Sequence, residues 1–266
     1  MKKFLTLSLV TLFSASALAQ PIEMLVAGKS GGSYFKLTRA IQKDIIQDTK
    51  VIDLGNCAKA KDYFENTDKP AIMMWSQATE IVKGCSIDHN KHFAGHLFGT
   101  TWALCGPVDT TKVAPSDNDK IGVVDYIDHI SQGLGGKAIP YANTAEIKQA
   151  LLAGDIDWGF TTLQKGMSAQ DAGEMRCVAG THTDDIPGLV KFSDVMPNYN
   201  YGTLKLDFYI LAVNIDEEKI RYIVENLVNN GAVTNKVVTK GMMYKNQSSK
   251  QEELEFVKQN EQLWRE

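Results

Sequence analysis

The sequence predicts an α/β protein of two lobes, and three of its features indicate this. Short apolar runs alternate with amphipathic stretches of helical length, as at residues 22–27, 121–124 and 156–160. Strands that alternate with helices form largely parallel sheets with helices on both faces. Two longer apolar segments interrupt the alternation, and 266 residues suffice for two lobes of ordinary size. One continuous α/β domain is the alternative interpretation.

The first predicted lobe begins with a strand, a glycine-rich turn and a helix. Residues 22–27 are mostly apolar, and residues 28–33 contain three glycines and two serines. The stretch after this turn has apolar residues at helical spacing. A second strand over residues 71–75 is expected to lead into a helix over residues 76–83.

The second predicted lobe repeats this pattern three times. Its strands and following helices are residues 121–124 with 125–134, residues 138–141 with 143–153, and residues 156–160 with 163–172. Asn143 and Glu146 have the spacing of a helix N-cap and its reciprocal partner, which supports the second of these helices.

Residues 97–105 and 204–212 are interpreted as crossover strands between the lobes. The first segment is largely apolar, and apolar residues recur in the second with a period of two. The chain then returns to helices, one after the N-cap residue Asp216 and one over residues 252–264. Each lobe is thus expected to be a mainly parallel sheet flanked by helices, with a ligand cleft at the lobe junction.

Residues 1–19 have the features of a cleavable export signal. The chain starts with Met1-Lys2-Lys3, continues with an apolar run relieved only by Thr and Ser, and offers a small-residue cleavage site that ends at Ala19. We therefore expect a periplasmic protein. Its predicted divisions are residues 1–19 as signal peptide, residues 20–104 with 180–266 as one lobe, and residues 105–179 as the other.

Four cysteines in an exported chain predict disulfide bonds. Cys57, Cys85, Cys105 and Cys177 form no C-x-x-C motif, and three pairings are possible. Pairing Cys57 with Cys85 and Cys105 with Cys177 is favoured, because each bond then braces one region.

The charge balance argues against nucleic acid as a partner. Loss of Lys2 and Lys3 with the signal leaves 26 basic against 32 acidic side chains, a net charge of about −6. The sequence contains no G-x-S-x-G, H-E-x-x-H or paired-carboxylate pattern, so we expect neither catalysis nor a cofactor. A secreted hydrolase using Ser33 or Ser76 is the most distant alternative.

The glycine-rich turn is suited to binding a small anion. Glycines permit a tight turn and expose successive N–H groups at the positive end of the following helix. Ser33 can cap that helix, and Tyr34 adds a hydroxyl. A nucleotide-binding P-loop is excluded because Glu23 stands where its first glycine must be. The structural alternative is a tight strand-to-helix turn without a ligand.

A histidine cluster offers a different function. His89, His92 and His96 lie within eight positions, and the last two share a face if this segment is helical. A metal carrier using these three residues, with Tyr34 or Tyr126 as added ligands, is therefore kept as an alternative.

The order of these segments resembles the Bug-type receptors, which are the periplasmic solute receptors of tripartite tricarboxylate transporters. Residues 31–33 and 37–41 are similar to the family's first glycine-rich loop and helix. Residues 140–141, 145–153 and 154–160 are similar to its proline-tyrosine pair, helix and following strand. The sequence Gly-Gly-Ser-Tyr-Phe also resembles receptors of the tripartite ATP-independent transporters. The resemblance extends over residues 22–230.

This resemblance implies a type II-like periplasmic-binding-protein architecture that closes over a small organic acid. Loop N–H groups and hydroxyls are expected to hold the ligand, and the matching positions are Ser30, Gly31, Gly32, Ser33, Tyr34, Trp75, Ser76, Gln77, Asp125, Tyr126, Thr161 and Thr162.

The sequence therefore predicts a monomeric solute-binding protein that delivers a small carboxylate to integral membrane transporter subunits. A receptor that reports the solute to a membrane kinase would need the same binding step, and it is the second alternative.

Overall fold

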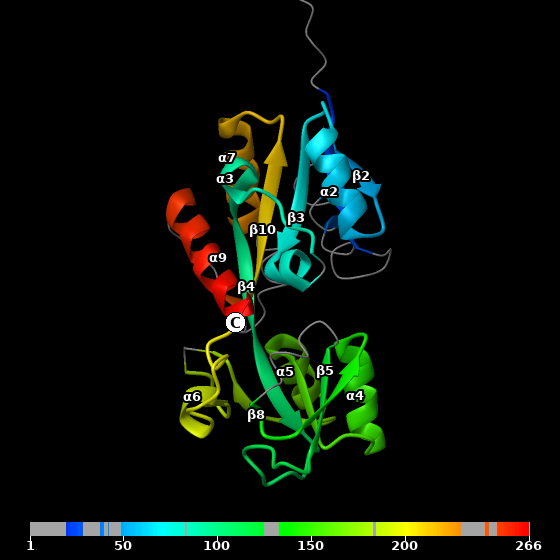
Figure 1. Ribbon diagram of the computed structural model, residues 1–266, viewed down its shortest axis with the longest axis vertical. Helices are drawn as coiled ribbons and strands as arrows, with labels where there is room; N and C mark the ends of the chain where they lie inside the picture. The colour runs from blue at the N-terminus through cyan, green and yellow to red at the C-terminus, as the bar shows by residue number, and fades with distance from the viewer. Residues whose placement is uncertain are drawn as a thin grey trace, which may run out of the picture.

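The computed structural model has two lobes stacked along its long axis and connected by one long strand, β4 (Phe93–Gly106) (Figure 1). It describes residues 20–28, 38–39, 42, 49–82, 84–124, 133–182, 185–229, 243–244 and 249–265. The export signal, the glycine-rich turn after Gly28 and residues 125–132 of the helix predicted over residues 125–134 lie outside these ranges.

The sheet of the first lobe has the strand order β2-β1-β3-β10-β4. Its strands are β1 (Ile22–Val26), β2 (Thr49–Asp53), β3 (Ala71–Ser76), β10 (Lys205–Val213), the first part of β4, and the short β11 (Met243–Tyr244). The associated helices are α2 (Cys57–Asn66), the π-helix η1 (Ala78–Val82), α3 (His89–His92), α7 (Glu217–Asn229) and α9 (Lys250–Arg265).

The second lobe continues the sheet from the last part of β4, in the order β4-β7-β5-β6. Its strands are β5 (Lys120–Val124), β6 (Lys137–Tyr141), β7 (Trp158–Thr162), β8 (Arg176–Gly180) and β9 (Val190–Lys191). Its helices are α4 (Thr144–Ala153), α5 (Leu163–Asp171) and α6 (Phe192–Val195).

Strand directions separate the lobe sheets from the crossover. β1 pairs in parallel with β2 and β3, β5 pairs in parallel with β6 and β7, and β8 pairs in parallel with β9. Among the named strands of the described chain, each antiparallel pair includes β4 or β10. The α/β fold of two lobes joined by a crossover strand is thus confirmed, although the sheet is mixed.

The crossover has a defined position in the sheet register. Thr101 of β4 pairs with Lys205 at the start of β10, and the next residue, Trp102, pairs with Thr162 of β7. β4 therefore leaves the first lobe at Thr101 and enters the second at Trp102. β10 pairs with first-lobe strands only, but Leu206 near its start belongs to the hydrophobic core of the second lobe. The chain returns to β10 through Leu204, whose carbonyl accepts a hydrogen bond from Thr181 Oγ1. The lobe boundaries at residues 104/105 and 179/180 remain a prediction.

Local sequence signals account for several helix starts. Asn143 Oδ1 accepts hydrogen bonds from the N–H groups of Ala145 and Glu146, and the Glu146 carboxylate in turn accepts from the N–H of Ala142. This is close to the predicted reciprocal cap, because both side chains satisfy N–H groups that the first helical turn leaves unpaired. Asp216 likewise accepts from the Lys219 N–H before α7.

Three differences from the sequence-based expectation concern the first lobe. The helix expected over residues 76–83 is the short π-helix η1. β2 and α2 were not predicted, although Asn56 caps α2 and buried residues recur at Cys57, Ala60 and Phe64. β2 has no fully buried side chain, which explains why it lacks the apolar signal of a central strand.

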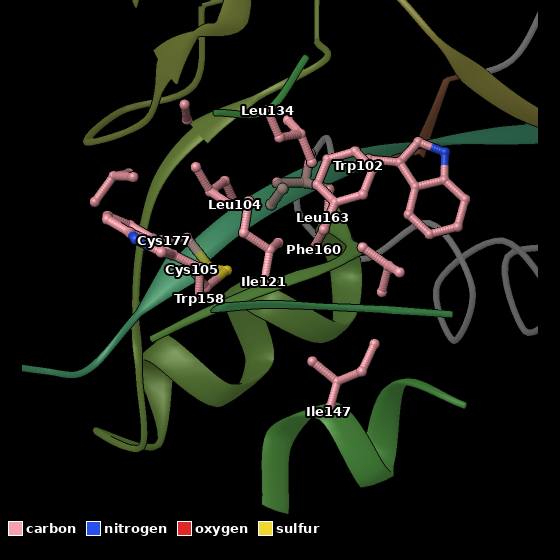
Figure 2. Packing of buried hydrophobic residues seen from close by; sticks show 14 of the residues in the cluster. Trp102, Leu104, Cys105, Ile121, Leu134, Ile147, Trp158, Phe160, Leu163 and Cys177 are labelled. Carbon is pink, nitrogen blue, oxygen red and sulfur yellow. A yellow bond between two sulfur atoms is a disulfide. The ribbon is translucent and has the colours of Figure 1, made fainter. Parts of the chain in front are cut away.

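Both disulfide bonds follow the favoured pairing. Cys57 at the start of α2 bonds Cys85 in the loop before α3. Cys105 of β4 bonds Cys177, its partner on the neighbouring strand β8. The second bond lies in the core of the second lobe among Trp158, Ile121 and Leu104 (Figure 2).

Candidate functional site

The lobe junction is where the fold favours a ligand. In α/β sheets, ligands bind outside the carboxyl ends of the parallel strands. The arrow of β3 ends at the junction in Figure 1, and the carboxyl end of β7 meets β4 one residue beyond the crossover point at Thr101. Each lobe therefore presents a strand end, followed by a helix, to the same region.

Seven of the predicted ligand-binding residues are not described by the structure. They are Ser30, Gly31, Gly32, Ser33, Tyr34, Asp125 and Tyr126, and they stay predictions.

The three predicted residues at the end of β3 make contacts within the first lobe. Trp75 is fully buried beside Tyr209, its partner on β10. Ser76 Oγ lies 3.3 Å from Thr79 Oγ1 at the start of η1. Both amide atoms of Gln77 bond one residue: its Nε2 donates to Asp207 Oδ2 (2.6 Å), and its Oε1 accepts from the Asp207 N–H (2.8 Å).

Asp207 is the centre of a buried network that the sequence did not reveal. Besides Gln77, its fully buried carboxylate is bonded by His96 Nε2 of β4 (3.0 Å) and by Asn260 Nδ2 of α9 (2.5 Å). A buried carboxylate needs such partners to offset the loss of its hydration. The single signal in the sequence is a charged residue inside the apolar alternation of residues 204–212.

The two predicted residues at the end of β7 lie at the start of α5. Thr161 is 4% exposed, and its Oγ1 is buried without a hydrogen-bond partner among the described residues. Thr162 is the N-cap residue of α5, and its side chain makes no cap bond there. The first turn of a helix has unpaired N–H groups and a partial positive charge, and both favour an anion. This strand end therefore combines a helix start without a side-chain cap with a buried hydroxyl that has no hydrogen-bond partner among the described residues.

The side chains of His89, His92 and His96 each contact a different partner, whereas a metal site built from them would need them side by side. His89 Nε2 contacts Glu80 Oε2 (2.8 Å), His92 Nδ1 contacts the carbonyl of Ala212 (3.3 Å), and His96 contacts Asp207. Within the described residues, the side chains that come together are Glu80, His89 and Glu261, whose ligand-type atoms lie within 4.8 Å of one another. Tyr209 donates to Glu80 Oε2 (2.8 Å) in the same cluster, so these groups already satisfy one another.

One hollow of about 320 Å³ is found on the second lobe, away from the junction. Asp157 and Trp158 line it at the amino end of β7, together with residues that follow β4 from Pro107 to Lys112. Because parallel strands present their ligands at the carboxyl ends, this position does not match the site that the fold favours. No helix in the described parts of the chain has the length and apolar content of a membrane span.

The chain shares its fold with a class of solved structures, the two-lobed periplasmic binding proteins. Within it, the chain is similar to a TctC solute-binding protein from Polaromonas, with a TM-score of 0.70, 13% identity, and coverage of 94% of this chain and 98% of that one.

Two further solved structures are similar at comparable levels. MatC (Rpa3494) from Rhodopseudomonas palustris, solved with bound malate, has a TM-score of 0.68 at 11% identity, covering 91% of this chain and 97% of that one. The periplasmic binding protein BugD has a TM-score of 0.66 at 12% identity, covering 92% and 95%. No family model and no curated protein sequence matches the chain. The resemblance seen in the order of motifs is confirmed at the level of the fold.

Proposed function

We propose that this protein is an exported solute-binding receptor that captures a small carboxylate and presents it to a membrane transporter. The observation that carries the proposal is the start of α5, where a helix start without a side-chain cap lies beside the buried hydroxyl of Thr161, which has no partner among the described residues. N–H and O–H groups donate hydrogen bonds, and a carboxylate accepts them.

The similarity to MatC, which was solved with malate, supports this ligand class. The glycine-rich turn predicted at residues 28–33 of the first lobe would supply more N–H donors to the same ligand. A receptor of micromolar affinity needs a binding free energy of about −8 kcal/mol, which a few hydrogen bonds to charge can supply in a closed cleft. The receptor performs no chemistry on its ligand, and its periplasmic location depends on the predicted signal at residues 1–19.

Isothermal titration against malate, succinate, adipate and citrate tests the proposal. We expect at least one of these acids to bind with a Kd of about 10 μM or tighter. Thr161→Val should weaken that binding about 10-fold, because a hydrogen bond to a charged group is lost. Thr144→Val, at the start of α4, is the matched control and should bind like the wild type. Absence of heat with all four acids would refute the proposal.

A further inference from the structure

A second buried hydroxyl lies unused at the lobe junction, on the crossover strand itself. Thr101 of β4 is 5% exposed, and its Oγ1 has no hydrogen-bond partner among the described residues. Buried side-chain hydroxyls are almost always paired in folded proteins, so each exception needs an explanation. Thr161 is the other threonine with such an atom in the described chain.

The sheet register places both threonines on one face. Thr161 pairs directly with Ala103 on the antiparallel strand, so their side chains point to the same side. Thr101 is two residues before Ala103, and side chains two apart on a strand share a face. Thr101 and Thr161 are therefore diagonal neighbours, with side chains about 7 Å apart.

Helix α5 begins on this same face. A Cβ added to Gly166 of α5 would lie 2.8 Å from Cys105 Sγ and 3.3 Å from the Thr161 methyl group, so the helix covers the row that contains Cys105 and Ala103. Thr101 lies on the same face of β4 as Ala103 and Cys105, one residue before Trp102. Trp102 pairs with Thr162, where β7 ends, and α5 starts at the next residue, Leu163. Its hydroxyl thus lies near the start of α5, which has no side-chain cap.

We infer that Thr101 is a ligand-contact residue, and that its hydroxyl and that of Thr161 donate to the two oxygens of one ligand carboxylate at the start of α5. Strand positions about 7 Å apart leave room for a carboxylate between their two hydroxyls, with hydrogen bonds of about 2.7 Å. This inference rests on the proposed function and deepens it, because it names the subsite that holds the carboxylate. It also gives the ligand a contact with the crossover strand, where the lobes meet.

Thr101→Val tests the inference, because valine keeps the shape and removes the hydroxyl. With the acid that binds the wild type most tightly, the Kd should rise about 10-fold or more. The melting temperature of the ligand-free variant should stay equal or rise, because an unpaired buried hydroxyl is removed. Thr101→Ser keeps a hydroxyl and should bind within about threefold of the wild type.

Thr181→Val is the matched control for a structural hydroxyl. Thr181 is fully buried nearby, and its Oγ1 accepts from the Trp102 N–H (2.9 Å) and donates to the Leu204 carbonyl (2.6 Å). This variant should melt at a lower temperature without ligand.

The outcomes separate the inference from the proposed function. If the wild type binds an acid and Thr101→Val binds it equally well, the inference alone is overturned. A ligand-free Thr101→Val that melts as early as Thr181→Val would also overturn it, because the hydroxyl would then have a structural role. If the wild type binds none of the four acids, both fail.

Discussion

At the scale of single residues, Gly166 of α5 is closely confined by the disulfide bond of the second lobe. A Cβ at this position would lie 2.8 Å from both sulfur atoms of the Cys105–Cys177 bond. Carbon atoms do not approach other heavy atoms this closely, and neither a disulfide nor the sheet beneath it can move far. The helix can pack onto the disulfide because residue 166 has no side chain.

Gly166→Ala should therefore destabilise the protein by about 2 kcal/mol. Alanine in place of a helical glycine ordinarily stabilises by about 1 kcal/mol, so the sign of the effect is diagnostic. Urea denaturation of the oxidised protein measures it. Gly202→Ala is the control, since its nearest contact would be at an ordinary 3.4 Å. A Gly166→Ala variant as stable as the wild type would contradict this packing.

Asp119 stabilises the loop that leads into β5. Burial alone raises the pKa of its carboxyl group, but hydrogen bonds from Trp158 Nε1, the Ser116 N–H and Lys112 Nζ outweigh burial and lower the pKa below the ordinary value. A group with a lowered pKa in the folded state stabilises the protein above its unfolded pKa, and this contribution is lost as the pH falls through the folded-state pKa.

Asp119→Asn should cost about 2 kcal/mol at pH 7, because bonds to a charged acceptor are lost. The difference from the wild type should shrink as the pH falls below about 4, where the wild-type carboxylate begins to lose its contribution. Melting temperatures of both proteins between pH 7 and pH 2 provide the comparison. Asp117→Asn, at an exposed neighbour, should show no such trend. A constant difference across the pH range would rule out this role.

At the scale of elements, α9 connects the cores of both lobes. Leu254 and Val257 belong to the first-lobe core. Asn260 bonds Asp207 at the crossover, and Trp264 belongs to the second-lobe core, where its ring lies 6.4 Å from that of Trp102. In Figure 1, α9 follows β4 toward the lobe junction. The helix therefore adds a third connection to the two made by the chain at β4 and before β10.

Trp264→Ala should destabilise the protein by roughly 3–5 kcal/mol, since a 1% exposed ring and its hydrogen bond to the Lys205 carbonyl are both lost. Denaturant unfolding followed by circular dichroism measures this cost. Gln262→Ala, an exposed position on the same helix, should change the stability by less than about 0.5 kcal/mol. Equal stabilities of the two variants would show that α9 does not anchor the second lobe.

At the scale of the whole molecule, the lobes are joined by few segments, which favours a hinge. The junction contains Thr101, the return of the chain at Leu204, and the bridging part of α9. Hinge motions are absorbed at such element ends. A ligand that contacts both lobes favours the closed arrangement by its difference in affinity for the two states.

Saturation with the acid that binds in the titration should lower the radius of gyration measured by small-angle X-ray scattering, because the lobes close over the ligand. Glucose, an uncharged solute, serves as the control and should leave the radius unchanged. A radius that stays the same at saturating carboxylate would mean that the lobes do not close over this ligand.

The sequence identified elements best where a single local signal decided them. Asn143, Asp216 and the apolar strands at residues 22–26 and 121–124 needed no distant partner to be recognised. β2 and α2 were missed because their stability comes from packing on β1 and from the bond of Cys57 to Cys85. The pairing of β2 with β1 has no signature in the neighbouring sequence, whereas α2 has local signals in its N-cap Asn56 and its buried residues at helical spacing that the prediction did not include.

In the candidate site, too, the residues with a local signal were predicted and those that depend on distant contacts were not. Thr161 and Thr162 were expected from the sequence, and the structure places both at the start of α5. Thr101 was not expected, because the role proposed for it depends on the register between β4 and β7, whose paired residues lie about 60 positions apart. Gln77 was expected to face the ligand, yet its amide bonds Asp207, 130 positions away.

The sequence by itself determined the α/β class and indicated two lobes and disulfide bonds, because the hydrophobic period, the helix caps and the number of cysteines can be recognised without knowing which distant residues meet. Which cysteines pair was one of three possibilities that the sequence left open. The tertiary structure alone decided which buried polar groups satisfy one another and which, among the described residues, have no partner. That choice depends on contacts between residues far apart in the chain, and the periodicity of a single segment does not encode them.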